Sequence, residues 1–190
     1  ILESGETFGL FDRGKQGVEL QIDGNTTLLT ANMEEIHDHI GDRVAISGMT
    51  TTSVMSAFRA LVTHYGAREE ELNLMITGGP DGDLGANEIQ CYKGKICLII
   101  DGGSILFDPQ GLDKKELRKI SFNRNSVPRV NTLGYPLEKL SPQGFSIPLN
   151  ATNVTLPDGT LVSDGALFHR TFLTGENVRT YLEQANIRAF

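Results

Sequence analysis

Three glycines spaced three residues apart, Gly79, Gly82 and Gly85, follow an apolar run over residues 72–77. The next apolar run along the chain ends on an acid, Asp101, 22 residues after Gly79. A dinucleotide site needs this order. The strand directs the backbone, the glycines let it approach a pyrophosphate, and the next strand brings a carboxylate to a ribose. The spacing therefore predicts a dinucleotide-binding loop, with NAD as the cofactor.

The same glycine segment has a simpler interpretation as a turn-rich connector. Gly-Pro-Asp-Gly at 79–82 is a common turn sequence, and the G-x-x-G-x-x-G spacing departs from the usual G-x-G-x-x-G. Asp81 and Asp83 are unusual neighbours for a pyrophosphate, because like charges repel. They either point away, hydrogen-bond the local backbone or hold a divalent metal; we predict no metal site.

The acid at position 101 favours NAD over NADP. Its carboxylate would accept hydrogen bonds from both ribose hydroxyls and would repel the 2′-phosphate of NADP, and no Arg follows it to favour that phosphate. The alternative is an acid that ends a strand and starts the turn at Gly102 and Gly103.

Hydroxyl and thiol side chains offer fewer functional candidates. The run from Thr50 to Ser53 is either a helix cap or a polar patch that faces a ligand, and a cap needs one hydroxyl rather than four. Cys91 and Cys97 lack metal-like spacing, so we predict buried thiols in a reducing compartment. No nucleophile, histidine and acid form a recognisable set, and we predict no catalytic residue.

The elements that position these residues alternate between strands and helices, which predicts an α/β fold with a mainly parallel sheet. A hairpin over 8–22 and a short helix over 33–40 precede them. The predicted elements that follow are helix 52–65, strand 72–77, helix 85–92, strand 96–100, loop 104–113, helix 114–122, loop 123–145, strand 146–149, hairpin 154–162, helix 177–185 and strand 187–190. Asp113 is predicted to cap helix 114–122, with Glu116 completing a capping box.

Composition excludes several classes of protein. The net charge of −7 argues against nucleic-acid binding, which usually shows a basic face. No apolar run approaches the roughly 20 residues that span a bilayer, so we expect no membrane segment and a cytoplasmic protein, or a mitochondrial one in a eukaryote. The chain opens on Ile1 without an initiator Met and ends on Phe190, which suggests a fragment of a longer polypeptide.

Four segments, 48–54, 77–89, 100–113 and 153–172, resemble the NAD-specific glutamate dehydrogenases of the large-subunit type, within the glutamate, leucine, phenylalanine and valine dehydrogenase superfamily. The resemblance implies a Rossmann-like domain over 46–190, with helices on both faces of its sheet, after an N-terminal hairpin or linker over 1–45. It implies reversible oxidative deamination of L-glutamate to 2-oxoglutarate and ammonia, with NAD as hydride acceptor. The implied cofactor-binding residues are Gly79, Gly82, Asp83, Leu84, Gly85, Asp101, Gly102 and, on the nicotinamide side, Thr50 or Thr51.

The glycine-rich lysine segment that carries the superfamily's acid–base chemistry is missing from this chain. We therefore expect the isolated chain to be inactive, with its chemistry supplied by a substrate domain of the same polypeptide in a homo-oligomer. Two other classes stay open. The chain could be a regulatory domain that senses a nucleotide without turnover, or a scaffold domain that has lost binding, with Asp81 and Asp83 marking a spoiled loop.

Overall fold

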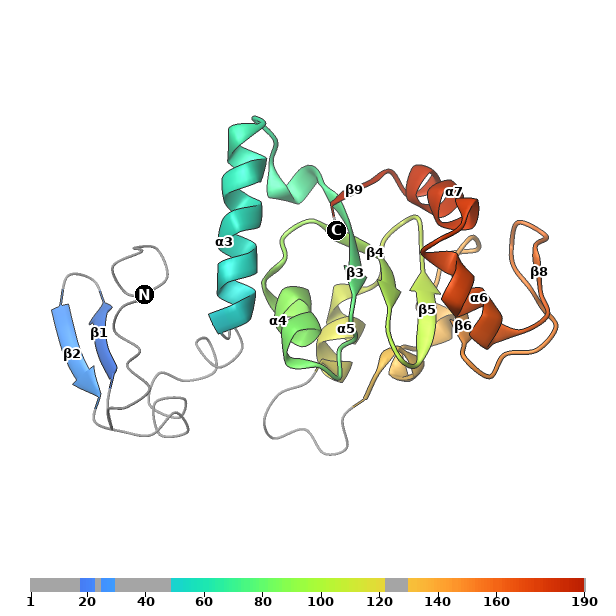
Figure 1. Cartoon of the computed structure of the whole chain (residues 1–190), viewed down its shortest axis with the longest axis horizontal. Coiled ribbons are helices and arrows are strands. Elements are labelled where there is room, and N and C mark those ends of the chain that lie inside the picture. Colours follow the sequence, from blue (N-terminus) through green and yellow to red (C-terminus); the bar gives the residue numbers. More distant parts are fainter. Residues whose placement is uncertain (1–17, 23–24, 30–48, 122–129, 190) are drawn as a thin grey trace.

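A computed structural model describes residues 18–22, 25–29, 49–121 and 130–189, and Figure 1 shows their arrangement. A central sheet carries helices on either side. The elements in chain order are β1 (Val18–Ile22), β2 (Asn25–Leu29), α3 (Met49–His64), η2 (Glu69–Glu71), β3 (Asn73–Thr77), α4 (Asp83–Cys91), β4 (Lys95–Ile100), β5 (Ser104–Phe107), α5 (Lys114–Ile120), η3 (Thr132–Gly134), η4 (Leu137–Lys139), β6 (Phe145–Pro148), β7 (Val154–Thr155), β8 (Leu161–Val162), α6 (Gly165–Phe172), α7 (Glu176–Gln184) and β9 (Ile187–Ala189).

The central sheet has five strands in the order β6-β5-β4-β3-β9. β3 pairs in parallel with β4 and with β9, whereas β5 is antiparallel to both β4 and β6. Four of the five strands therefore run in one direction, which confirms the predicted mainly parallel α/β sheet. The chain leaves β3 toward β4 on one side, and β9 lies on the other. In open α/β sheets, ligands bind at the carboxyl ends of the strands where the order reverses in this way.

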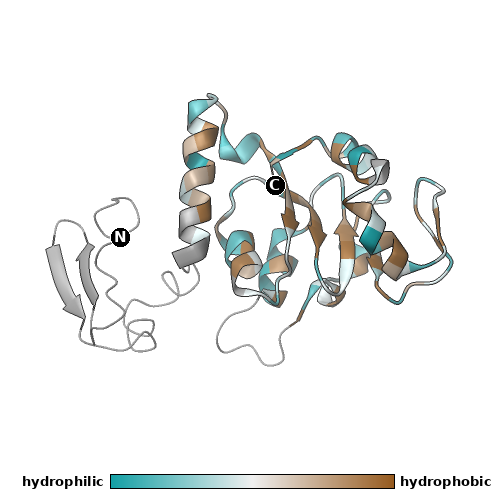
Figure 2. Ribbon diagram, viewed as in Figure 1, coloured by the Kyte–Doolittle hydropathy of each residue, from teal (hydrophilic) through white to brown (hydrophobic). Residues whose placement is uncertain are grey.

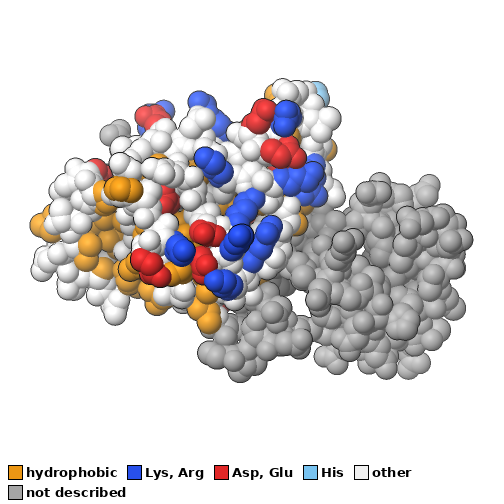
Figure 3. Space-filling model, turned by 180° about the vertical axis from the view of Figure 1, so that it is seen from behind, with side chains coloured by type: hydrophobic (Ala, Val, Ile, Leu, Met, Phe, Trp, Pro, Cys, Tyr) orange, Lys and Arg blue, Asp and Glu red, His pale blue; other side chains and the backbone are white. Residues whose placement is uncertain are grey.

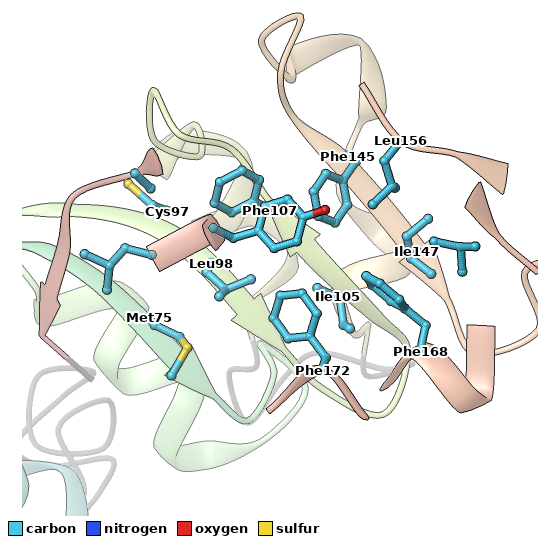
Figure 4. Close-up of a cluster of buried hydrophobic side chains, with 14 residues drawn as sticks. Met75, Cys97, Leu98, Ile105, Phe107, Phe145, Ile147, Leu156, Phe168 and Phe172 are labelled. Carbon is cyan, nitrogen blue, oxygen red and sulfur yellow. The ribbon is translucent and has the colours of Figure 1, made fainter. Parts of the chain in front are cut away.

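Helices cover both faces of the sheet, as predicted (Figure 1). α3, α4 and α5 pack on one face, and α6 and α7 pack on the other. β4 is apolar along nearly its whole length because both of its faces are buried, and Figure 2 shows the same apolar character along the central strands. On the α6–α7 side, aromatic rings from strands and helices pack together (Figure 4). The ring centroids of Phe107 and Tyr181 are 5.2 Å apart.

Two parts of the fold differ from the sequence prediction. The segment 104–107, predicted as part of a loop, is strand β5, and all four of its residues are buried between β4 and β6. Helix α6 was not predicted, although Asp164 caps it by accepting a hydrogen bond from the Leu167 N–H and Phe168 and Phe172 share its buried face. In both cases, nearby glycines suggested a loop, and the apolar run was too short to predict a strand or helix.

Several element boundaries also move. α3 begins at Met49, three residues earlier than predicted, so Thr50 and Thr51 lie in its first turn. α4 begins at Asp83, two residues earlier than predicted. The N-terminal hairpin joins β1 to β2, one strand later than predicted. Residues 8–17 and the predicted helix 33–40 lie outside the described residues.

The predicted cap of α5 is confirmed. The Asp113 carboxylate accepts hydrogen bonds from the N–H groups of Lys115 and Glu116. The reciprocal half of a capping box is not formed, because the Asp113 N–H donates to the Tyr135 hydroxyl and the Glu116 carboxylate binds Lys119. The prediction of a full capping box was therefore wrong, since tertiary partners compete for both groups.

Candidate functional site

A glycine turn joins β3 to α4 at the carboxyl edge of the sheet. Gly78 has a φ of +115°, which favours glycine, and its N–H donates to the Ile100 carbonyl at 2.8 Å. Sequence reasoning took Gly79 as the first glycine of the loop and missed Gly78. The signal was present, because Pro80 restricts the residue before it to extended conformations and moves the turn back by one position.

The remaining glycines of the loop have different environments. A Cβ at Gly85 would overlap the Gly79 carbonyl oxygen and lie 3.0 Å from that of Gly78, so glycine at 85 lets α4 pack directly on the turn. Among the described residues, a Cβ at Gly82 would meet only the Gly79 carbonyl oxygen, at 3.7 Å. Packing within the protein therefore explains glycine at 85 but not at 82.

Gly82 is also the N-cap of α4 and, as a glycine, has no side chain with which to cap this helix end. The first turn of α4, which includes Asp83 and Leu84, points its N–H groups and the positive end of the helix dipole toward the glycine turn. A helix N-terminus preceded by a glycine turn is a well-known arrangement for binding phosphate groups. Open space beside Gly82 is what the approach of a ligand to the backbone requires.

The basic side chains around α4 lie at its other end. Lys114 donates to the carbonyls of Tyr92 and Lys93, both at 2.9 Å, and Arg118 donates to the Gln90 carbonyl at 3.5 Å. Figure 3 shows Lys and Arg side chains gathered on the back of the molecule, with acids between them. Lys114 and Arg118 complement the negative end of the α4 dipole. An anion at the glycine turn would therefore be held by backbone groups rather than by these side chains.

Asp101 lies directly beside the glycine turn, as the sequence spacing predicts. A Cβ at Gly79 would overlap the Oδ2 atom of Asp101. The carboxylate also has partners of its own: Oδ1 accepts hydrogen bonds from the N–H groups of Gly103 and Ser104 at 2.7 and 3.0 Å. The interpretation of Asp101 as the first residue of a turn is therefore correct, whatever else the side chain binds. Gly102, at the tip of this turn, is exposed.

Thr132 is a partner of Asp101 that sequence reasoning missed. Its N–H donates to Oδ2 at 2.8 Å and its hydroxyl donates to Oδ1 at 2.5 Å. Thr132 is fully buried at the start of η3, within a segment predicted as loop. No local pattern could have found it, because 31 residues separate it from Asp101.

Asp81 points toward the turn rather than away from it. Its Oδ1 atom would lie 2.6 Å from a Cβ at Gly79, so Asp81 and Asp101 approach the same α-carbon. Asp83 is the first residue of α4.

Within the described part of the chain, no group of three His, Cys, Asp or Glu side chains is placed to hold a metal ion. The same residues include no helix long and apolar enough to cross a membrane.

Helix α3 brings Thr51 to the same end of the sheet. α3 and α4 lie side by side and run in the same direction (Figure 1), and Arg59 Nη2 donates to the Cys91 carbonyl at 3.3 Å. Arg59 lies eight residues after Thr51 in α3, and Cys91 lies eight residues after Asp83 in α4. Each spacing corresponds to about 12 Å along its helix. Thr51, which is buried, therefore lies at the level of the first turn of α4.

An ion pair fixes α3 in this position. Arg59 Nε binds Glu69 Oε2 at 2.8 Å, and Glu69 Oε1 also accepts from the Lys93 N–H at 3.0 Å. Burial alone would raise the pKa of the Glu69 carboxyl, but these hydrogen bonds outweigh burial and lower it.

Both cysteines are free thiols; Cys97 is buried as predicted, whereas Cys91 is partly exposed.

Comparison with known proteins adds to this geometry. Residues 41–157 match the family model described as Glutamate/Leucine/Phenylalanine/Valine dehydrogenase. Glutamate dehydrogenase 2 of Dictyostelium discoideum is 38% identical over 125 residues, covering 66% of this chain and 12% of the relative. The NAD-specific glutamate dehydrogenase of Neurospora crassa is 37% identical over 130 residues, covering 68% of this chain and 12% of the relative. The NAD-specific glutamate dehydrogenase of Saccharomyces cerevisiae is 36% identical over 129 residues, covering 67% of this chain and 11% of the relative. The matched part of the chain thus spans about an eighth of these relatives. No solved structure matches the chain significantly.

Proposed function

Because the chain belongs to the glutamate, leucine, phenylalanine and valine dehydrogenase family, we propose that it is the NAD-binding domain of a glutamate dehydrogenase. One observation carries the proposal: the turn at Gly78 and the N-terminus of α4 meet Asp101 at the carboxyl edge of the sheet, beside the point where the strand order reverses. The names of two of the relatives above, which specify NAD, support this cofactor over NADP.

In this proposal the pyrophosphate lies over Gly82, where the backbone is open, and is bound by the first turn of α4. Glycine at 79 lets the turn pack against Asp101, and glycine at 85 lets α4 pack against the turn. The adenosine ribose lies near Asp101 and Gly102. Thr50 or Thr51 faces the nicotinamide side from the first turn of α3.

Bound NAD supplies the hydride acceptor for the oxidative deamination of L-glutamate to 2-oxoglutarate and ammonia. This chain's residues bind and orient the cofactor, while the acid–base groups come from the substrate domain of the same polypeptide, which forms a homo-oligomer. The isolated chain is therefore expected to produce no NADH from glutamate. Measurable glutamate-dependent NADH production by the purified 190-residue chain would contradict this part of the proposal.

Calorimetric titration with NAD tests the binding site. Gly82→Ala places a methyl group where the pyrophosphate would approach, so we expect the affinity for NAD to fall at least about fivefold, as for a clash of about 1–3 kcal/mol. Gly175→Ala is the matched control, because Gly175 is also an N-cap without a side-chain hydrogen bond, at the start of α7. It should bind NAD like the wild type.

Two results would contradict the proposal. The first is a folded wild-type protein that shows no heat of binding at millimolar NAD. The second is an equal loss of affinity in Gly82→Ala and Gly175→Ala, because the effect would then come from helix capping rather than from the space beside Gly82.

A further inference from the structure

Hydrogen bonds from the protein itself occupy most of the acceptor positions of the Asp101 carboxylate. Oδ1 accepts from the N–H groups of Gly103 and Ser104 and from the hydroxyl of Thr132. Oδ2 accepts from the N–H of Thr132. A carboxylate offers about four acceptor positions over its two oxygens. Counting the described residues, Oδ1 therefore has no position left for a ligand, and Oδ2 retains one.

A chain of three hydroxyls holds this arrangement in place. Ser146 Oγ donates to Ser104 Oγ at 3.1 Å, Ser104 Oγ donates to Thr132 Oγ1 at 2.7 Å, and Thr132 Oγ1 donates to Asp101. Ser104 and Thr132 are fully buried. Each hydroxyl has one proton to donate, and a carboxylate can only accept. All three protons therefore point along the chain toward Asp101, and successive hydrogen bonds in such a chain strengthen one another.

The remaining acceptor position faces the glycine turn. Oδ2 lies against the α-carbon of Gly79, within the turn that leads to α4. Oδ1 instead binds its own turn, through the N–H groups of Gly103 and Ser104, and the Thr132 hydroxyl. A ribose placed beside the glycine turn would therefore meet Oδ2 and not Oδ1.

We propose that Asp101 binds the adenosine ribose of NAD through Oδ2 alone, accepting a hydrogen bond from one of its two hydroxyls, and that Thr132 is the residue that positions the carboxylate for this contact. The proposal rests on NAD binding as proposed above. It differs from the expectation that both ribose hydroxyls bind the acid, because Thr132 and the turn already occupy the second oxygen. Thr132 itself does not touch the cofactor.

The test compares NAD with two analogues that lack either the 2′- or the 3′-hydroxyl of the adenosine ribose. In the wild-type protein, one analogue should bind at least about tenfold more weakly than NAD, since a hydrogen bond to a charged group is lost. The other should bind within about twofold of NAD. Thr132→Val removes the hydroxyl that positions Asp101, so NAD binding should weaken about tenfold, whereas binding of the sensitive analogue should not change.

Thr132→Ser is the control, because it keeps the hydroxyl and removes only a methyl group; it should bind NAD like the wild type. If Thr132→Val does not fold, Ser104→Ala tests the same chain one step further from Asp101. It should weaken NAD binding about threefold, again without affecting the sensitive analogue.

The possible failures are distinguishable. A folded wild-type protein that does not bind NAD overturns the proposed function. NAD binding that weakens equally with either missing hydroxyl overturns single-oxygen recognition. A Thr132→Val or Ser104→Ala protein that loses the same factor with NAD and with both analogues overturns the positioning role, because a general structural defect would act on all three ligands.

Discussion

The carboxylate of Asp101 lies against the α-carbon of Gly79, in the space that any larger side chain at position 79 would need. This contact joins the end of β3 to the end of β4, two neighbouring parallel strands. It makes glycine necessary at position 79 for reasons within the protein. The contact also places an acid within the glycine turn, where a ribose and a pyrophosphate would lie next to each other.

Gly79→Ala is expected to lower the free energy of unfolding by about 1–3 kcal/mol, because the new methyl group would overlap Asp101 and come close to Asp81. Urea unfolding measures this loss. Gly102→Ala is the control, since a Cβ there meets no atom of the described part of the chain within 4 Å. It should change the free energy by less than about 0.5 kcal/mol. Similar losses in both variants would show that the Asp101 contact does not constrain position 79.

Asp81→Asn is expected to raise the affinity for NAD severalfold at low salt. The carboxylate points into the glycine turn, and like charges repel the pyrophosphate. The gain should shrink as ionic strength rises, because salt screens partly exposed charges. Glu183→Gln, on α7 across the sheet, removes the same charge and should leave the affinity unchanged. Weaker binding by Asp81→Asn would mean that Asp81 assists the cofactor.

Arg59→Met is expected to lower the free energy of unfolding by about 1–3 kcal/mol at pH 7, because it leaves the buried Glu69 carboxylate without its cation. The pKa of Glu69 is lowered in the folded protein from its ordinary value of 4.5. A lowered pKa stabilises the folded state above the unfolded value, and this stability is lost as the pH falls through the folded value.

The difference between wild type and Arg59→Met should therefore be constant above about pH 5 and shrink below the ordinary pKa of 4.5, as measured by urea unfolding over that range. Arg179→Met is the control, since its partner Glu183 and Arg179 itself are both largely exposed. Its effect should stay below about 0.5 kcal/mol at every pH. A difference that stays constant down to pH 3 would assign the loss to packing of the Arg59 stem instead.

Cys97 is expected to resist thiol reagents in the folded protein. Burial raises its pKa to about 11, so almost no thiolate is present at pH 8, and the side chain is fully buried. Cys91 is partly exposed, although burial raises its pKa as well, and should react slowly. Ellman titration should detect one slow thiol in the native protein and both thiols in urea. Two thiols reacting at equal rates in the native protein would contradict the burial of Cys97.

Much of this protein is determined by local sequence patterns. Helix α3, strands β3 and β4, the β7–β8 hairpin and the Asp113 cap of α5 were all predicted, because apolar periodicity and turn residues act over a few positions. The order of glycine loop, strand and acid also predicted that Gly79 and Asp101 would lie together. That prediction succeeded because neighbouring parallel strands bring their carboxyl ends to one edge of the sheet.

Other features were decided only by contacts between distant segments. Residues 104–107 form a strand because β4 and β6 bind it on both sides, a partnership that glycine-rich flanks conceal in the sequence. The turn falls on Gly78 because its N–H reaches the Ile100 carbonyl. Thr132 holds Asp101 from 31 residues away. Sequence alone thus determined which acid stands at the glycine turn, and the tertiary structure decided which of its two oxygens remains open, because hydrogen-bond partners are set by distance in space.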